Sequence, residues 1–113
     1  FRGGLGLDLE FEMLEETYIT TVVERTKFPP WGINNGKEGR ANNVEILKKS
    51  GKNFYMPKKS GYKLSKGDSI VFKTGGGGGY GEPSKRNKEL IKNDLKQGYL
   101  SKEYVFQNYK HYY

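Results

Sequence analysis

The residues that could carry chemistry in this sequence are a run of five glycines, a group of glutamates and a single histidine. Gly76-x-Gly78-x-x-Gly81 formally matches the dinucleotide-binding fingerprint, but five consecutive glycines satisfy many patterns. In a dinucleotide site the turn leads directly into a helix whose N-terminus holds the pyrophosphate, whereas Glu82-Pro83 follows here. The run instead predicts a loop that adopts positive φ or approaches another surface closely, with a flexible linker as the alternative.

The glutamates lie close together near the start of the chain, as Glu10, Glu12, Glu15 and Glu16. Catalytic carboxylates need burial or a partner that separates their pKa values. The sequence indicates neither, so we interpret these side chains as a solvated face beside cations such as Arg25.

The chain contains no Cys, and His111 is its one histidine. The absence of Cys excludes disulfides, a thiolate zinc site and a Cys nucleophile. A single His in an aromatic tail leaves little material for a metal site or a His-based triad. We therefore expect no metal ligands and no complete catalytic site in this segment.

Charge is distributed unevenly along the 113 residues, whose formal net charge is +7. Residues 1–24 contain one basic and six acidic residues, whereas residues 25–113 contain 19 basic and seven acidic residues. Because 16 of the 20 cations are Lys and base-reading proteins rely on Arg, a solvated surface is favoured over nucleic-acid recognition. One alternative stays open: the eight Lys between residues 48 and 73, interleaved with Phe54, Tyr55 and Tyr62, could form a basic β module that binds RNA or single-stranded nucleic acid.

Strands are the main elements expected to position these residues. Strict alternation of apolar and acidic residues over 7–13 predicts a half-buried strand. The β-branched segment 17–26 predicts a second strand, paired with the first through a short turn. Further strands are predicted over 43–48 and 52–56, as a hairpin, and over 69–74.

After the glycine run the hydrophobic period changes to that of helices. A helix is predicted over 87–97, with Asn87 as its N-cap and Gly98 just beyond its end. A second helix is predicted over 102–110, with Ser101 as its N-cap. The expected fold class is α+β, mainly antiparallel β with a C-terminal helical pair.

We divide the chain into a β-rich part with the glycine-rich loop, residues 1–83, and a helical appendage, residues 84–113, which together form one structural unit. No apolar run approaches the roughly 20 residues of a membrane helix, and the first residues do not resemble a signal peptide. We expect no membrane partner and a cytoplasmic location. The missing initiator Met indicates a fragment, a processed chain or trimmed numbering.

The block from Thr74 to Pro83 resembles part of a known family, and further matches to that family follow in order along the chain. The family is hydantoinase B/5-oxoprolinase, the B-type subunit of ATP-dependent hydantoinases, 5-oxoprolinases and acetone carboxylases. The other matching positions are Arg2-Gly3-Gly4-Leu5-Gly6, Glu24-Arg25, Pro30-Trp31-Gly32, Gly36-Lys37-x-Gly39, Lys58 or Lys59, Gly67-Asp68, Arg86, Asp94, Gly98, Ser101 and Tyr109. The sequence departs from the family pattern at Asn87-Lys88, where Asp-Pro is usual, and at Lys110-His111, where Gly-Val is usual.

The resemblance implies that this chain is the C-terminal part of a subunit several times longer. That family opens cyclic amides such as hydantoins, N-methylhydantoin type substrates or 5-oxoproline at the expense of ATP, or carboxylates acetone. It implies that the nucleotide machinery belongs to a hydantoinase A-like partner subunit, and that metal-binding and catalytic residues lie in the N-terminal portion of the B-type subunit. We therefore expect ATP and a divalent metal in the complete enzyme, no cofactor in this segment, and no catalysis by this segment alone.

Two groups of residues are predicted as functional positions, and the catalytic residues are not identified. The first is a loop surface that contacts the backbone of a neighbouring domain or partner: Gly76, Gly77, Gly78, Gly79, Tyr80, Gly81, Pro30, Trp31 and Gly32. The second is a possible charged site comprising Arg25, Asp68 and Arg86. The expected partners are the rest of the same subunit and the A-like subunit, and we do not expect nucleic acid to be one.

Overall fold

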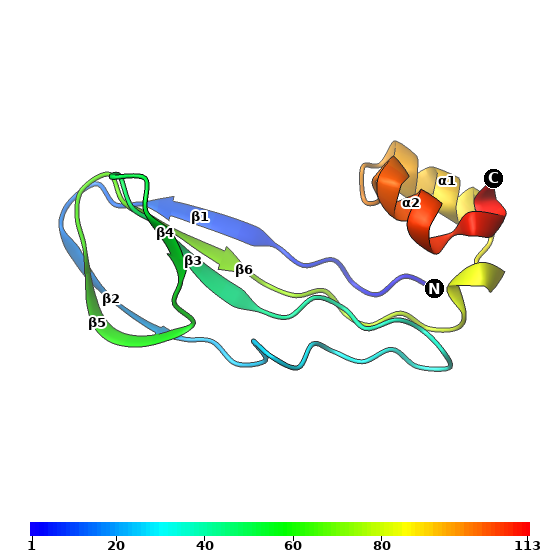
Figure 1. Ribbon diagram of the computed structural model, residues 1–113, viewed down its shortest axis with the longest axis horizontal. Helices are drawn as coiled ribbons and strands as arrows, with labels where there is room; N and C mark the ends of the chain where they lie inside the picture. The colour runs from blue at the N-terminus through cyan, green and yellow to red at the C-terminus, as the bar shows by residue number, and fades with distance from the viewer.

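Strands precede helices in the computed structural model, which describes residues 1–113 (Figure 1). The strands are β1 Asp8–Glu12, β2 Thr17–Val22, β3 Asn43–Leu47, β4 Asn53–Tyr55, β5 Lys58–Leu64 and β6 Ser69–Lys73. The helices are the 3-10 turn η1 Pro83–Lys85, α1 Lys88–Lys96, α2 Lys102–Asn108 and the 3-10 turn η2 Lys110–Tyr112. The predicted class, α+β with mainly antiparallel strands and a C-terminal helical pair, is confirmed.

The strands form two small antiparallel sheets with an apolar core between them. One sheet has the order β1-β6-β3-β4, and the other pairs β2 with β5. The core consists of Val44, Ile46 and Ile70 from the larger sheet together with Leu64 of β5 and Met56. We call this part of the molecule, residues 8–73 without the loop at 25–42, the strand unit.

The predicted pairing between residues 7–13 and 17–26 is wrong. β1 pairs with β6, with Leu9 opposite Phe72 and Phe11 opposite Ile70, whereas β2 pairs with β5 in the other sheet. The physical reason is burial. Because β2 lies in the second sheet, across the core from β3 and β6, its Ile19 side chain packs against the core. If β2 were the neighbour of β1 in the first sheet, Ile19 would lie outside this core. Arg25 consequently lies over the ring of Trp31 rather than beside the acidic face of β1.

Other local predictions are confirmed. β3 and β4 form the predicted hairpin, with Ile46 opposite Phe54. The side chain of Asn87 accepts a hydrogen bond from the backbone N–H of Glu89, and Ser101 accepts one from Tyr104. Gly98 has a φ of +76°, the left-handed conformation expected just beyond a helix end.

The predicted half-burial of the first strand is only partly met. Alternation does place Leu9 and Phe11 on the core side of the sheet, as their cross-strand partners show. Yet Leu9 is 45% exposed and Phe11 is 51% exposed, because the β2–β5 ribbon packs on the core residues of β3 and β6 and not on these two side chains. The core side of β1 is therefore uncovered in this chain.

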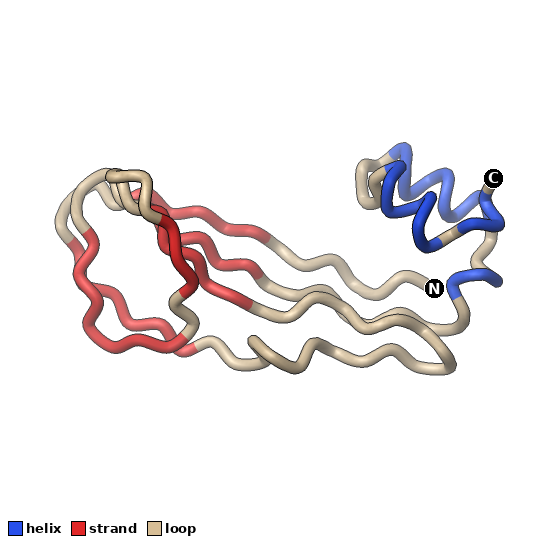
Figure 2. Tube along the Cα trace, in the orientation of Figure 1, coloured by secondary structure: helices blue, strands red, loops and turns tan.

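Beyond the sheet, extended segments run side by side between the strands and the helical end, seen as tan tube in Figure 2. Residues 30–42 turn back on themselves, with the N–H of Gly39 donating to the carbonyl of Pro30 at 2.8 Å. We call residues 1–7, 30–42 and 74–81 the glycine layer. The N–H groups of Thr74, Gly77 and Tyr80 donate to the carbonyls of Leu7, Gly4 and Phe1, at 2.8, 3.0 and 2.9 Å. These bonds recur every third residue on both segments, which is the repeat of a polyproline II helix rather than of a β-strand.

The molecule is elongated. Its Cα radius of gyration is 17.6 Å and its axes measure 50 × 25 × 18 Å, whereas a compact domain of this length has a radius of about 13 Å. A second small core of Ile91, Val105 and Tyr109 lies between α1 and α2, at the opposite end from the strand unit (Figure 1). Neither helix combines the length and apolar character needed to cross a bilayer. Whether residue 83 divides two domains stays a prediction.

Candidate functional site

The glycine layer brings backbone against backbone at distances that no side chain could tolerate. A Cβ on Gly78 would lie 1.9 Å from the carbonyl oxygen of Trp31, and one on Gly76 would lie 2.4 Å from that of Gly4. On the partner segments, a Cβ on Gly3 would lie 2.2 Å from the Gly77 oxygen. Because real Cβ contacts do not occur below about 3 Å, these positions exclude every other residue type.

The other predicted loop residues have looser surroundings. A Cβ on Gly77 would lie 3.3 Å from the nearest atom and one on Gly79 would lie 3.2 Å away, and Gly81 has a φ of +77°. Tyr80 donates its N–H to Phe1 and forms a parallel bridge with Ile33. All these contacts lie within the chain, so contact between this loop and a separate domain or partner stays a prediction.

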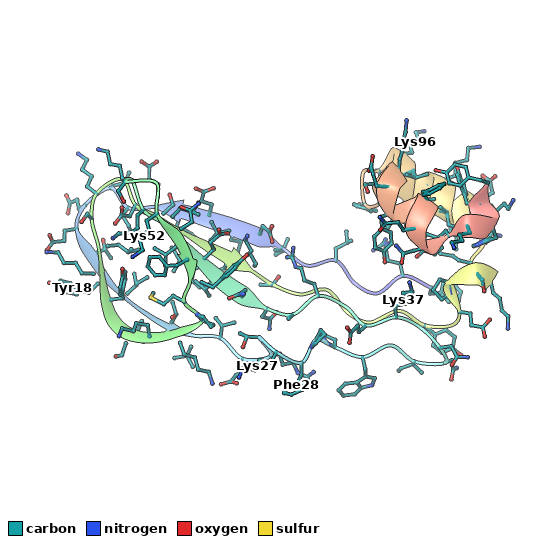
Figure 3. The ribbon with its side chains drawn as sticks, in the orientation of Figure 1. Tyr18, Lys27, Phe28, Lys37, Lys52 and Lys96 are labelled. Carbon is teal, nitrogen blue, oxygen red and sulfur yellow. The ribbon has the colours of Figure 1, made fainter.

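Pro30, Trp31 and Gly32 join this loop on the outer side of the layer. The backbone carbonyl of Trp31 packs on Gly78. The indole side chain of Trp31 is 69% exposed, and the Arg25 guanidinium lies over it, 5.4 Å from the ring centroid. Phe28 is 79% exposed and lies on the outer edge of the molecule in Figure 3. We call the exposed rings of Phe28 and Trp31, with the Arg25 guanidinium over the indole, the Trp31 surface.

At the other end of the layer, a buried charge cluster attaches the helices. Asp94 of α1 is almost fully buried, and its Oδ2 accepts hydrogen bonds from Arg86 Nη2 at 2.5 Å and Arg2 Nε at 2.9 Å. Burial raises the pKa of the Asp94 carboxyl, but the hydrogen bonds from the two guanidinium groups outweigh it and hold the pKa below its usual value. The cluster therefore joins the first segment of the layer to α1.

Aromatic rings and a histidine complete this junction. The guanidinium of Arg86 lies 5.5 Å from the ring centroid of Tyr109 and donates to its hydroxyl at 3.2 Å. His111 Nε2 lies 2.8 Å from the Arg86 carbonyl and donates to it in the neutral tautomer that carries the proton on Nε2. Lys37 of the layer donates to Asn108 Oδ1 of α2 at 2.6 Å, and Figure 3 shows its side chain directed towards the helices.

An open cavity of about 700 Å³ lies between the glycine layer and the helical pair. Its walls include Gly4 and Gly76 of the layer, Arg40, and Tyr99 and Tyr104 from the helical part. No group of three or more His, Asp or Glu side chains in the chain lies close enough together to hold a metal ion. The wall also includes the carboxylates of Asp8 and Glu38 and the hydroxyl of Ser101. Asp8 is paired with Arg40 and the Ser101 hydroxyl accepts the Tyr104 N–H, so no nucleophile is paired with a base.

The three residues of the predicted charged site lie in different places. Asp68 is buried in the turn between β5 and β6, where it pairs with Lys48 at 2.7 Å and accepts N–H bonds from Lys49 and Ser65. The hydrogen bonds from Lys48 and these two amides lower the pKa of Asp68 to about 2. Arg25 lies over Trp31 and Arg86 binds Asp94, so the structure does not bring the three together.

Two charged residues of the junction, Arg2 and Asp94, were not predicted as site residues. Both belong to the motif positions that carry the family resemblance, which was the available signal. Sequence reasoning did not connect them because they are 92 residues apart and meet only through the folding back of the glycine layer.

A family model described as Hydantoinase B/oxoprolinase matches residues 1–83. An uncharacterised protein of Methanocaldococcus jannaschii is 36% identical over 110 residues, which is 97% of this chain and 19% of that protein. The putative B-type subunit of a D-/L-hydantoinase from a Pseudomonas species is 27% identical over 111 residues, 96% of this chain and 19% of the relative. The 5-oxoprolinase of Dictyostelium discoideum is 29% identical over 82 residues, 73% of this chain and 6% of the relative.

The chain thus spans about a fifth of the first two relatives and a smaller share of the third. No solved structure matches the chain.

Proposed function

Because the chain belongs to the hydantoinase B/oxoprolinase family, we propose that it is the C-terminal domain of a hydantoinase B-type subunit and has a structural, interface-forming role there. The observation that carries this proposal is exposed apolar surface. Eighteen large apolar side chains are exposed and nine apolar residues are buried, and large exposed apolar surfaces mark sites of contact with another protein surface. The elongated shape agrees with a piece that packs into a larger body.

Two exposed surfaces support this role. The Trp31 surface presents an indole and a phenyl ring held on a stiff Pro29-Pro30 segment, and aromatic anchors of this kind dominate many interfaces. The core side of β1 presents Leu9 and Phe11, whose cross-strand neighbours on β6 are Phe72 and the buried Ile70. We propose that the remainder of the subunit covers both.

The whole protein is proposed to be an ATP-dependent enzyme that opens a cyclic amide such as hydantoin or 5-oxoproline, in line with the names of its relatives. ATP and a divalent metal are proposed to bind outside this domain, and a hydantoinase A-like subunit is the proposed partner enzyme chain. A cytoplasmic location is part of the same proposal. The 113 residues alone are not proposed to catalyse the reaction, because the cavity holds no nucleophile paired with a base.

The alternative of a nucleic-acid module has less support. Of the eight lysines between residues 48 and 73, four bind carboxylates, in the pairs Lys48–Asp68, Lys58–Glu24, Lys63–Glu16 and Lys73–Glu45. Phe54 and Tyr62 pack edge to face against each other beside the core, at 5.9 Å between ring centroids. Stacking platforms need several exposed rings beside free cations, whereas half of these lysines are paired and Tyr55 is the one exposed ring of the three.

The proposal is tested by expressing residues 1–113 and the remaining part of the full-length subunit as separate chains. We expect the two chains to co-purify and, with the hydantoinase A-like subunit added, to recover ATP-coupled opening of hydantoin or 5-oxoproline that neither chain supports alone. Trp31→Ala is expected to weaken the association about tenfold or more, as loss of an aromatic anchor does. Tyr18→Ala, an equally exposed aromatic on β2 outside both surfaces, is the matched control. Failure of the chains to associate, or activity from residues 1–113 alone, would contradict the proposal.

A further inference from the structure

We propose that the outer edge of β1 pairs with one further β-strand, in which Lys or Arg alternates with apolar residues, supplied by the rest of the subunit. This inference rests on the proposed function, since it names what the remainder of the subunit places against this domain. It is carried by three separate features of β1: its free hydrogen-bonding edge, its unpaired carboxylates and its uncovered apolar side.

The hydrogen-bonding edge is free because β1 is the terminal strand of its sheet. Thr74 N–H donates to the Leu7 carbonyl and Met13 N–H donates to the Asp68 carbonyl, each at 2.8 Å. Bonded and non-bonded residues alternate along an antiparallel strand, so the odd-numbered residues of β1 bond to β6. The N–H and C=O groups of Asp8, Glu10 and Glu12 consequently point to the free edge.

The same three residues form an acidic face. Asp8 is paired with Arg40 at 2.6 Å, but Glu10 and Glu12 have no cation within salt-bridge distance, and their cross-strand neighbours on β6 are Val71 and Ser69. A residue directly opposite either glutamate on an added strand would lie on the same face, about 5 Å away. Lys or Arg there would neutralise a carboxylate, and Asp or Glu would be repelled.

The opposite side of β1 is apolar. Leu9 and Phe11 are about half exposed, and Phe11 already packs edge to face on Phe72 at 6.0 Å between ring centroids. An added strand with apolar residues opposite Leu9 and Phe11 would continue this surface. Acidic side chains alone can simply protect an edge from aggregation, but protection does not account for the leucine and phenylalanine left uncovered on the same strand.

These requirements define the partner. A second copy of β1 is disfavoured because glutamates would face glutamates across the new pair. The strand that fits has period two, with cations opposite Asp8, Glu10 and Glu12 and apolar residues between them. The longer relatives leave about four fifths of a subunit outside this chain, ample sequence to supply it.

The test uses the ¹⁵N-labelled 113-residue chain and the peptide acetyl-Lys-Val-Lys-Leu-Lys-Val-amide, titrated into the millimolar range. We expect the amides of Glu10 and Glu12 to shift and their hydrogen exchange to slow by about tenfold or more, because these N–H groups become hydrogen-bonded. A peptide with Glu in place of each Lys is expected to have no effect. The double variant Glu10→Lys with Glu12→Lys is expected to reverse this preference, and Glu89→Lys with Glu103→Lys, on exposed helical positions, is the matched control that retains it.

No shift at Glu10 and Glu12, protection located instead at the other sheet edge in β4, or an unchanged preference in the double variant would each overturn the proposal. The separated-chain experiment distinguishes it from the proposed function. If residues 1–113 bind the rest of the subunit and the β1 double variant binds equally well, the β1 proposal is wrong and the proposed function stands. If residues 1–113 do not bind at all, the proposed function fails.

Discussion

The strand unit and the glycine layer are both built from extended chain, yet different forces hold them together. In the strand unit, apolar side chains such as Val44, Ile46 and Leu64 are removed completely from water. In the glycine layer, the side chains are absent or point outwards, and Gly76 and Gly78 let carbonyl oxygens of other segments approach the Cα directly. The strand unit is stabilised by the apolar side-chain surface that it buries, whereas the glycine layer requires that its contact positions have no side chain.

This difference indicates how each region tolerates change. A core position of the strand unit accepts another apolar residue of similar volume at modest cost. A close-contact glycine of the layer accepts no other residue, because the atom that a Cβ would meet is backbone and cannot rotate away. The layer thus depends on few residue types, and its close-contact positions accept only glycine.

The largest expected change in the free energy of unfolding comes from truncating a buried isoleucine of the strand unit, compared with an exposed isoleucine of the glycine layer. Ile46 is completely buried in the strand unit, so Ile46→Ala should lower the free energy of unfolding by about 2–5 kcal/mol. Ile33 lies in the layer and is 56% exposed, so Ile33→Ala should change it by no more than about 0.5 kcal/mol. Urea denaturation of both variants measures the contrast, and equal losses would contradict this comparison of the two regions.

Within the glycine layer, adding one methyl group should be costly only where a backbone carbonyl lies against the glycine. Gly78→Ala places a Cβ against the Trp31 carbonyl and should cost about 1–3 kcal/mol, as overpacking does. Gly4→Ala is the matched control, because its Cβ would meet no atom within 4 Å and its φ is not left-handed. That variant should be neutral or gain up to about 1 kcal/mol from the reduced entropy of the unfolded chain. Hydrogen exchange at the Ile33 amide, which donates to Gly79, reports whether the layer has opened, and an unaffected Gly78→Ala variant would favour the flexible-linker interpretation.

A smaller and pH-dependent effect is expected at Asp68, in the strand unit. Its pKa of about 2 lies below the ordinary 3.8, so the unfolded chain binds a proton there before the folded chain does. The stabilising contribution of Asp68 is therefore complete above about pH 4 and is lost as the pH falls towards 2. Thermal unfolding between pH 5 and pH 2 should show a steeper decline for the parent protein than for Asp68→Asn. Parallel curves would show that Asp68 does not contribute to the acid sensitivity.

Local features of the fold were predictable from the sequence, because short-range chemistry decides them. The caps at Asn87 and Ser101 and the left-handed Gly98 follow from which side chains and backbones can adopt those geometries. The β3–β4 hairpin follows from two β-rich runs separated by Lys49-Ser50-Gly51. The family was also recognisable, because its motif residues are spread along the whole chain and do not depend on knowing the pairing.

The partners of each segment were decided only by the tertiary structure. Alternation correctly assigned the two faces of β1 but could not reveal that β6, about 60 residues away, outcompetes the neighbouring β2 as its partner. The glycine run indicated that a close approach was possible without showing that Gly3, Gly36 and Gly39 lie on the segments packed against it. In the same way, Arg2 reaches Asp94 only because the layer folds back on itself. Sequence determines what each residue can tolerate, and tertiary packing determines which residues it meets, because the free energy of burial depends on contacts between segments far apart in the chain.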